Sequence, residues 1–428
     1  MRVAVITGMG AVTAFGAGVD VLWSGLAAGT GAVGPIRSFP TEAFPVQVAG
    51  EVPVIQTDSA WVRAASRSDA LAPDVLVALA ADGALRDRKV AFALAAAAQA
   101  WSAAHCGDAE RSAALVLGLG LERGFPEDSA TLMAGARMDW SREDGAGLPV
   151  VRFRASVDLA GRAVRRALGL RGALVTHVSA CAAGALAVAH AAALVRRGEA
   201  DVVLCGAADS MVNPLGLAGM WRLGALSPRH AADACRPFDR DRDGVAMGEG
   251  AAIFVVEDAA RARARGVEPL CAILGAGSSQ DAYRATAPRP DGLAAARAMT
   301  AALADARVQA TDVGYINAHG TGTPLNDPAE CRAIRRALGP HADRVAVSSI
   351  KGAVGHLMAA SGAVELLAAA LALQHDLLPG TAHLLRADPA CDLDLIGGQP
   401  RPARVAIALS NSFGFGGQNG CIVLGRTA

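Results

Sequence analysis

The sequence predicts an α/β protein whose sheets are mostly buried between helices. Short runs rich in β-branched residues alternate along the chain with longer alanine-rich stretches of helical length. The runs are almost continuously apolar, which is typical of strands covered on both faces. A chain of 428 residues, 52% of them hydrophobic and 19% charged, can bury a large core.

The order of these segments along the chain indicates two halves. The expected strands cover residues 3–7, 113–121, 173–179, 201–207, 251–257, 269–277, 313–319, 344–349, 404–410 and 420–425. The expected helices cover residues 91–104, 182–197, 290–306, 328–338 and 361–374. Alternation of this kind predicts layers of helices on sheets. We place the halves at residues 1–257 and 258–428, and without a long linker they should share a tight interface.

The charge balance excludes two classes of partner. Forty basic residues balance 40 acidic ones, so no global field draws the protein to nucleic acid or to an anionic membrane. Residues 178–195 carry no charge, but they are rich in alanine and glycine and contain Ser179 and His190, which favours a buried helix over a membrane span. The first 18 residues have one positive charge and an apolar run broken by glycines, so a strand and turn fit better than a signal peptide.

The eight cysteines are dispersed and predict neither disulfides nor a metal site. There is no CxxC pair and no His/Cys cluster at zinc spacing. A chain of this size without a disulfide framework indicates a reducing, cytoplasmic location. The segment GMGAVTAFG after the first strand has Thr13 where a dinucleotide fingerprint needs its third glycine, and GxxxxGK[ST] and HExxH are both absent.

Cys181 lies between an expected strand and an expected helix, in HVSACAAGALAVAHAAAL (residues 177–194). It is either a buried structural cysteine or a nucleophile at a helix N-terminus. Lowering a thiol pKa from about 8.5 to below 7 requires roughly 2 kcal/mol. A helix terminus typically supplies about 0.3–1 kcal/mol and at best ~2 kcal/mol. A nucleophilic Cys181 should therefore have a histidine nearby.

Two histidines lie among glycines in the second half of the chain. His319 ends an expected strand and enters GTGTPLNDPAE, and His356 lies in SSIKGAVGHLMAASGAVE, close to Lys351 and Glu365. Glycines allow another segment or a ligand to approach closely, although each histidine could also have a purely structural role. Lys351 is one of only two lysines, with Lys89, in a chain that otherwise uses arginine. The loop SNSFGFGGQNG, residues 410–420, could present backbone N–H groups to an oxyanion.

Together these segments resemble the elongating β-ketoacyl-ACP synthases, condensing enzymes of the thiolase fold. The resemblance runs in order over the whole chain, through GMGAVTAFG, SAC, ACRPFDRDRDG, NAHGTGTPLNDPAE, SSIKGAVGHLMAASGAVE and NSFGFGGQNG. It implies a thiolase-like fold of two similar α/β halves in an α-β-α-β-α arrangement. It also implies that no metal or other cofactor is needed, because the substrates arrive on the phosphopantetheine of an acyl carrier protein (ACP).

The resemblance implies a role for each residue of the site. Cys181 would take the acyl chain as a thioester, and His319 and His356 would bind the malonyl thioester and stabilise its enolate. By the same resemblance, Lys351 and Glu365 would form a buried ion pair, and the backbone N–H groups of Cys181 and Phe415 would form the oxyanion hole, with Phe415 also acting as the gate. Thr321 and Thr323 would contact the pantetheine arm, and Met220 and Trp221 would line the acyl tunnel. Asp327, Glu330 and Phe413 match supporting residues.

The pathway and the subunit partner stay open. The chain is expected to act as a 3-oxoacyl-ACP synthase, with the ketosynthase subunit of a type II polyketide synthase as the alternative. A homodimer and a heterodimer with a chain-length-factor homologue are both possible. A non-catalytic chain-length partner or a degradative thiolase fits the Cys–His–His set less well. Val245, Gln418 and the Met220–Trp221 pair depart from the usual family pattern and put the preferred acyl chain in doubt. An acidic ACP should dock on arginines: Arg162, Arg165 and Arg166, or those within residues 222–242.

Overall fold

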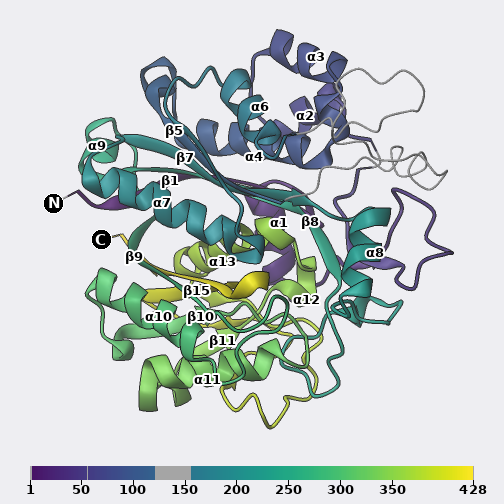
Figure 1. Ribbon diagram of the computed structural model, residues 1–428. Coiled ribbons are helices and arrows are strands. Elements are labelled where there is room, and N and C mark those ends of the chain that lie inside the picture. Colours follow the sequence, from purple (N-terminus) through teal and green to yellow (C-terminus); the bar gives the residue numbers. More distant parts are fainter. Residues whose placement is uncertain (1, 55, 121–155, 428) are drawn as a thin grey trace.

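The protein, seen in a computed structural model that describes residues 2–54, 56–120 and 156–427, has three layers of helices enclosing two layers of sheet (Figure 1). This confirms the expected α-β-α-β-α arrangement. The helices of the three layers are, in order, α4 (Arg88–Ala103) and α6 (Leu159–Ala167), α7 (Ala183–Arg197) and α13 (Ser361–His375), and α10 (Leu293–Ala306) and α11 (Asn326–Leu338).

The strands of the two halves form separate regions of the sheet. From one edge to the other the order is β13 (Asp394–Leu395), β11 (Ala346–Ser348), β10 (Val313–Asn317), β15 (Ile407–Gly414), β16 (Gln418–Gly425), β9 (Cys271–Gln280), β1 (Ala4–Thr13), β8 (Met247–Asp258), β7 (Val202–Ser210), β5 (Ala114–Leu119) and β6 (Leu174–His177). Among the described strands, β1 and β9 join the two regions, through the pairs Val5–Ala272 and Ile6–Cys271. The boundary at residue 257 stays a prediction.

Each expected strand and helix overlaps an observed one, but the shorter elements were not expected. The further helices are α6 and also α1 (Val19–Ala27), α2 (Ser59–Ser66), α3 (Pro73–Ala81), α8 (Pro214–Arg222), α9 (Ala259–Ala264) and α12 (Lys351–Val354). The further strands are β13 and also β2 (Gly16–Ala17), β3 (Gly34–Pro35), β4 (Val48–Gly50), β12 (Leu377–Leu378) and β14 (Arg401–Pro402). These helices have nine residues or fewer, too few for a clear apolar period.

The central helices α7 and α13 touch through glycines. A Cβ atom on Gly184 would lie 2.7 Å from the backbone nitrogen of Ala363, and one on Gly362 would lie 2.9 Å from that of Ala185. The segments Ala180–Arg197 and Met358–His375 are apolar and long enough to cross a membrane, yet 56% and 89% of them are buried inside the protein. Their apolar character is explained by their place between the sheets, where small residues let the two helices approach.

We predict that Gly184→Ala lowers the free energy of unfolding by about 1–3 kcal/mol, because the new methyl group overlaps backbone atoms of α13. The matched control is Gly219→Ala in α8, where a Cβ atom meets nothing within 4 Å. This control should raise the stability by up to about 1 kcal/mol. Chemical denaturation of the two variants measures both effects. Equal stability of the two would contradict a tight α7–α13 contact.

Candidate active site

Cys181 lies in a short turn that leads from β6 into α7. The turn is the 3₁₀ helix η3 (Ala180–Ala182), in which Ala180 has a φ of 46°, a conformation that costs energy for a residue with a Cβ atom. Cys181 is 3% exposed, and its Sγ accepts a hydrogen bond from the backbone N–H of Phe415. The predicted strand, turn and helix around the cysteine are therefore present.

The glycine and phenylalanine loop crosses directly over this turn. A Cβ atom on Gly414 would lie 3.1 Å from the backbone nitrogen of Cys181 and 3.2 Å from the carbonyl oxygen of Ser179, so glycine lets β15 approach closely. The next residue, Phe415, starts the short helix η8 (Phe415–Gly417) and is half-buried. Phe413, almost buried, places its ring centroid 5.9 Å from that of His319. The loop thus contacts both the cysteine and one histidine.

His319 is held by two charged groups behind the cavity. Its backbone N–H donates to Glu330 at 2.8 Å, and the N–H of Gly320 donates to the other oxygen of the same carboxylate. Its ring Nδ1 lies 3.1 Å from the ammonium of Lys351, which also donates to the His319 carbonyl oxygen and to Glu365. Because an ammonium group only donates, Nδ1 must accept, and the ring proton is on Nε2.

His356 has the same tautomer for a different reason. Its Nδ1 accepts from the backbone N–H of Met358 at 3.0 Å and lies 2.9 Å from the hydroxyl of Ser361. A backbone N–H can only donate, so the proton of this ring is also on Nε2. Met358 has a φ of 50°, and this strained turn places its N–H against the ring.

The three side chains converge on one point. The sulfur of Cys181 and one ring nitrogen each from His319 and His356 all lie within 4.8 Å of one another, and the two rings stand nearly perpendicular at 84°. The same residue types bind metals elsewhere. Here each Nδ1 already accepts a hydrogen bond and each Nε2 carries a proton, so neither ring offers a free lone pair to an ion.

Burial keeps all three side chains uncharged at neutral pH. It lowers the pKa of both histidines well below the usual value, helped by the nearby Lys351 and, for His356, by His319. Burial raises the pKa of Cys181 to about 12, although Lys351 and the Phe415 N–H act in the opposite direction. The resting protein therefore has a thiol, not a thiolate, close to two neutral imidazole rings.

We predict that alkylation of Cys181 by iodoacetamide accelerates about tenfold per pH unit from pH 7 to pH 10 without a plateau, because the thiolate fraction rises this way below a pKa of about 12. The rate is measured by peptide mass spectrometry, which separates Cys181 from the half-buried Cys106. Cys181→Ala corrects for other sites. A plateau below pH 8 would instead indicate a thiolate in the resting enzyme.

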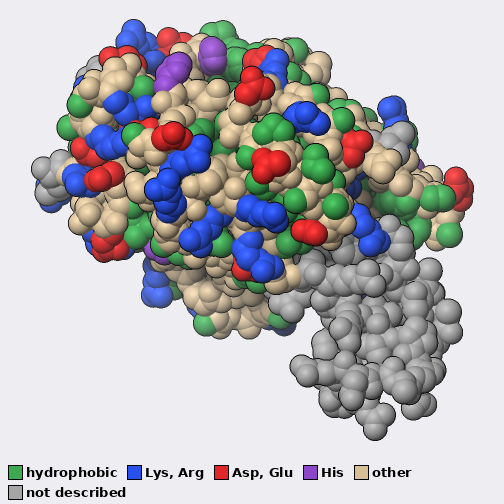
Figure 2. All heavy atoms as spheres, turned by 90° about the horizontal axis from the view of Figure 1, so that it is seen from above, with side chains coloured by type: hydrophobic (Ala, Val, Ile, Leu, Met, Phe, Trp, Pro, Cys, Tyr) green, Lys and Arg blue, Asp and Glu red, His purple; other side chains and the backbone are tan. Residues whose placement is uncertain are grey.

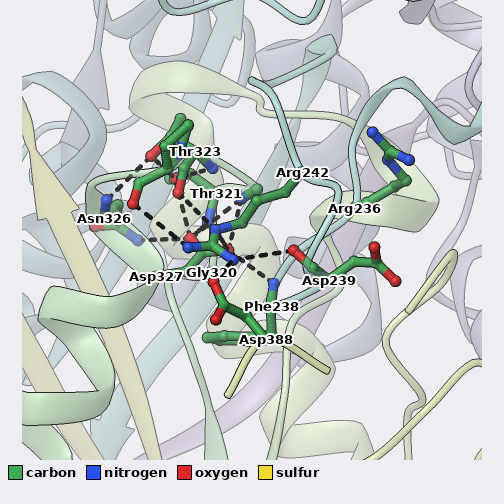
Figure 3. Close-up of polar contacts among 12 residues, drawn as sticks. Arg236, Phe238, Asp239, Arg242, Gly320, Thr321, Thr323, Asn326, Asp327 and Asp388 are labelled. Atoms are coloured by element: carbon green, nitrogen blue, oxygen red, sulfur yellow. Dashed lines mark hydrogen bonds and ion pairs between the residues drawn. The ribbon is translucent and has the colours of Figure 1, made fainter. Parts of the chain in front are cut away.

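Thr321 and Thr323 line the same cavity, which has a volume of about 320 Å³. Their hydroxyl oxygens lie 2.9 Å apart, and the carboxylate of Asp327 accepts hydrogen bonds from the backbone N–H groups of Thr321 and Gly322 (Figure 3). Asp327 and Glu330 belong to the first turns of α11, where the helix dipole favours negative charge. Both carboxylates thus hold the loop between β10 and α11.

Of the two residues assigned to an acyl tunnel, Met220 borders the cavity of the described chain and Trp221 does not, and the tunnel itself stays a prediction. Met220 is 4% exposed, packs in one cluster with Cys181 and Val245, and lines the cavity. Trp221 is 38% exposed and is not among the described residues around the cavity. Consecutive residues of a helix point about 100° apart, so α8 cannot turn both toward one cavity.

The two candidate arginine patches differ in accessibility. Arg162, Arg165 and Arg166 lie exposed on the outer face of α6, the side of the molecule on which Figure 2 shows many basic side chains. Within residues 222–242, in contrast, the side chains of Arg236 and Arg242 are only 7% and 5% exposed and form ion pairs. These two arginines are therefore unavailable for docking.

Three contributors to the site were not found from the sequence. Met358 and Ser361 set the tautomer of His356, and Asp209 accepts the backbone N–H of Ala359 at 2.9 Å in the same turn. None of them carries a recognisable motif. The short spacing of Ser361 from His356 was the one available signal for a local hydrogen bond.

Comparisons with known proteins agree on one family. Residues 1–262 match the model for the N-terminal domain of β-ketoacyl synthases, and residues 270–385 match the model for the C-terminal domain. A curated "3-oxoacyl-[acyl-carrier-protein] synthase 2" of Synechocystis sp. is 38% identical and covers 97% of this chain and 96% of its own. The protein of the same name from Coxiella burnetii is 35% identical and covers 99% of each chain.

Solved structures show the same fold over the entire chain. "The ishigamide ketosynthase/chain length factor" is 33% identical with a TM-score of 0.85. A structure described as "type II PKS acyl-carrier protein in complex with its ketosynthase bound to the hexaketide" is 28% identical with a TM-score of 0.82. Each covers 100% of this chain and of its own.

Proposed function

The chain belongs to the β-ketoacyl synthase family of thiolase-like condensing enzymes, and we propose that Cys181, His319 and His356 carry its reaction. As an acyltransferase it joins an enzyme-bound acyl chain to a malonyl unit with loss of CO₂. The observation that supports the residue roles best is the convergence of one thiol and one ring nitrogen from each of two neutral histidines within 4.8 Å.

Acylation begins at Cys181. Its sulfur attacks the thioester carbonyl of an acyl-ACP, and the thiol proton leaves with the departing pantetheine thiol. The backbone N–H groups of Cys181 and Phe415 receive the negative oxygen of the tetrahedral intermediate. The position of the Phe415 N–H, already directed at Sγ, supports this role, and the half-buried Phe415 ring is the proposed gate between acyl and malonyl entry.

Decarboxylation and condensation follow at the two histidines. The carbonyl oxygen of the malonyl thioester accepts the Nε2–H groups of His319 and His356. As CO₂ leaves, the electrons of the broken C–C bond form an enolate that these donors stabilise. Its carbon then attacks the thioester on Cys181, and the sulfur leaves and regains a proton. Neutral rings suit this role, because each can donate without first being protonated.

The other cavity residues support binding. The hydroxyls of Thr321 and Thr323 are proposed to bond the phosphopantetheine arm, and Met220 to contact the acyl chain. Because substrates come on this arm, no metal or other cofactor is assigned. ACP is the proposed partner, supported by the related ketosynthase that was solved with its acyl carrier protein. The acidic ACP would meet exposed arginines such as those of α6. A cytoplasmic location stays a prediction.

A second subunit is also proposed. Strand β6 lies at one edge of the sheet that the described residues form, all four of its residues are half-buried, and Val178 just after it is 39% exposed. The backbone groups of such an edge are a template for a second chain. The similarity to a ketosynthase/chain-length-factor structure favours, as a second candidate function, the catalytic subunit of a type II polyketide synthase. The partner is then a homologue instead of a second copy.

We predict that Lys351→Met keeps acyl transfer to Cys181 but lowers the condensation rate by about 10²-fold or more, because Nδ1 of His319 loses its donor and the Nε2–H tautomer is no longer fixed. Acylation is followed by intact-protein mass spectrometry and condensation by CO₂ release. The control is Arg197→Met at the C-terminal end of α7, whose exposed side chain pairs with Glu199 and which should leave condensation nearly unchanged. An equal loss in both variants would contradict the role of Lys351.

The proposed function is tested by intact-protein mass spectrometry after incubation with medium-chain acyl-ACPs. We predict a single acyl adduct that is absent from Cys181→Ala, because only this buried thiol is assigned the nucleophilic role. The measurement is made with the chain alone and with a chain-length-factor homologue. Acylation of the chain alone supports the fatty-acid reading, and acylation only with the homologue supports the polyketide reading. A folded protein without any adduct contradicts both.

A further inference from the structure

Arg242 is a buried cation beside the pantetheine-binding turn. Its side chain is 5% exposed, with Nη1 2.5 Å from Asp388 and Nε 3.7 Å from Asp327 (Figure 3). The guanidinium also donates to three carbonyl oxygens, those of Thr323 at 3.0 Å, Asp239 at 3.0 Å and Pro324 at 3.4 Å. A buried charge requires partners of this kind, and here they come from three separate segments.

Asp327 depends on a nearby cation because it is fully buried. Burial raises the pKa of its carboxyl group, while the Phe238 N–H and Arg242 oppose that effect. The carboxylate accepts backbone N–H groups from both sides: Phe238 at 2.7 Å, and Thr321 and Gly322 in the turn. Protonation or displacement of this carboxylate would release the turn.

The same guanidinium binds the far side of the turn through the carbonyl oxygens of Thr323 and Pro324. The turn is thus held at its N–H groups by Asp327 and at its carbonyl oxygens by Arg242. Asp388 fixes the guanidinium in place, and its own loop is tied to the chain near Arg242 by the bond from the Asp388 N–H to the Phe238 carbonyl. Thr321 and Thr323 therefore face the cavity from a turn with fixed geometry.

We propose that Arg242 is a positioning residue that sets the affinity for the phosphopantetheine arm by holding the Thr321–Thr323 turn. The inference rests on the proposed function, in which these two hydroxyls bond the arm. Arg242 acts through the turn, since it is not among the described residues that line the cavity. Cys181, His319 and His356 do not contact the guanidinium through any hydrogen bond of the described chain.

The expected effect is on binding of the arm and not on the chemical step. In Arg242→Met the turn loses two carbonyl contacts and Asp327 loses its cation, so KM for malonyl-ACP should rise about tenfold or more while kcat changes by no more than about threefold. Arg242→Lys keeps a positive charge between Asp327 and Asp388 but cannot donate hydrogen bonds to the carbonyl oxygens of both Thr323 and Pro324. It should rescue part of the lost affinity.

The experiment compares Arg242→Met, Arg242→Lys and the control Arg197→Met in one assay of malonyl-ACP condensation. Arg197 ends α7, outside both candidate docking patches, and its side chain is 54% exposed and pairs with Glu199. The second readout is iodoacetamide alkylation of Cys181, which needs no pantetheine arm. Positioning of the turn is supported if alkylation of Cys181 is unchanged while KM is raised, and raised more in Arg242→Met than in Arg242→Lys.

Three results would overturn the inference. A KM in Arg242→Met equal to that of Arg197→Met removes the link to the arm. A fall in kcat with unchanged KM places the effect on chemistry, and slowed alkylation of Cys181 in proportion to lost activity indicates general structural damage. If Arg242→Met does not fold, Arg242→Lys alone decides between these results. Wild-type protein that does not turn over malonyl-ACP would instead overturn the proposed function itself.

Discussion

The buried ammonium of Lys351 is the interaction on which the rest of the site depends. It is fully buried, and its three protons meet the ring nitrogen and the carbonyl oxygen of His319 and the carboxylate of Glu365. A charge so far from water is tolerated only when every proton has an acceptor. That requirement fixes α12, α13 and the end of β10 relative to one another, and it determines which nitrogen of His319 carries the proton.

The scaffold makes such a cluster possible by keeping its central helices close. Gly184 and Gly362 let α7 and α13 meet at backbone distance, so the turn before α7 and the turn before α13 come together. Cys181 lies in the first of these turns, and Met358 and Ser361, which bond His356, lie in and just after the second. The abundance of alanine and glycine thus has a direct consequence for the site: larger residues would separate Cys181 from the two histidines.

The sequence predicted the long elements and singled out the three side chains that meet in the cavity, because continuous apolar runs and glycine-flanked polar residues are local signals. The helices at 59–66 and 73–81 were missed although Asp58 caps the first and Pro73 opens the second. The tautomer of His356 depends on a turn at Met358 with a φ of 50°, which no pattern revealed. Arg242 stands in a charged loop that looks solvated, and only the fold shows it buried. Trp221 does not border the cavity of the described chain that Met220 lines, because consecutive residues of a helix point about 100° apart.

The distribution of charge explains how the hydrogen-bond donors are oriented in a cavity whose three central side chains are neutral. Glu330 and Asp327 bind backbone N–H groups of the loop that carries His319, and Lys351 with Glu365 lies behind its ring. The thiol and both imidazoles that meet in the cavity are neutral. Fixed charges placed on the backbone orient the donors without attracting water to the reacting atoms. Negative charge that develops on a substrate oxygen then meets N–H groups already in position, at little cost in reorganisation.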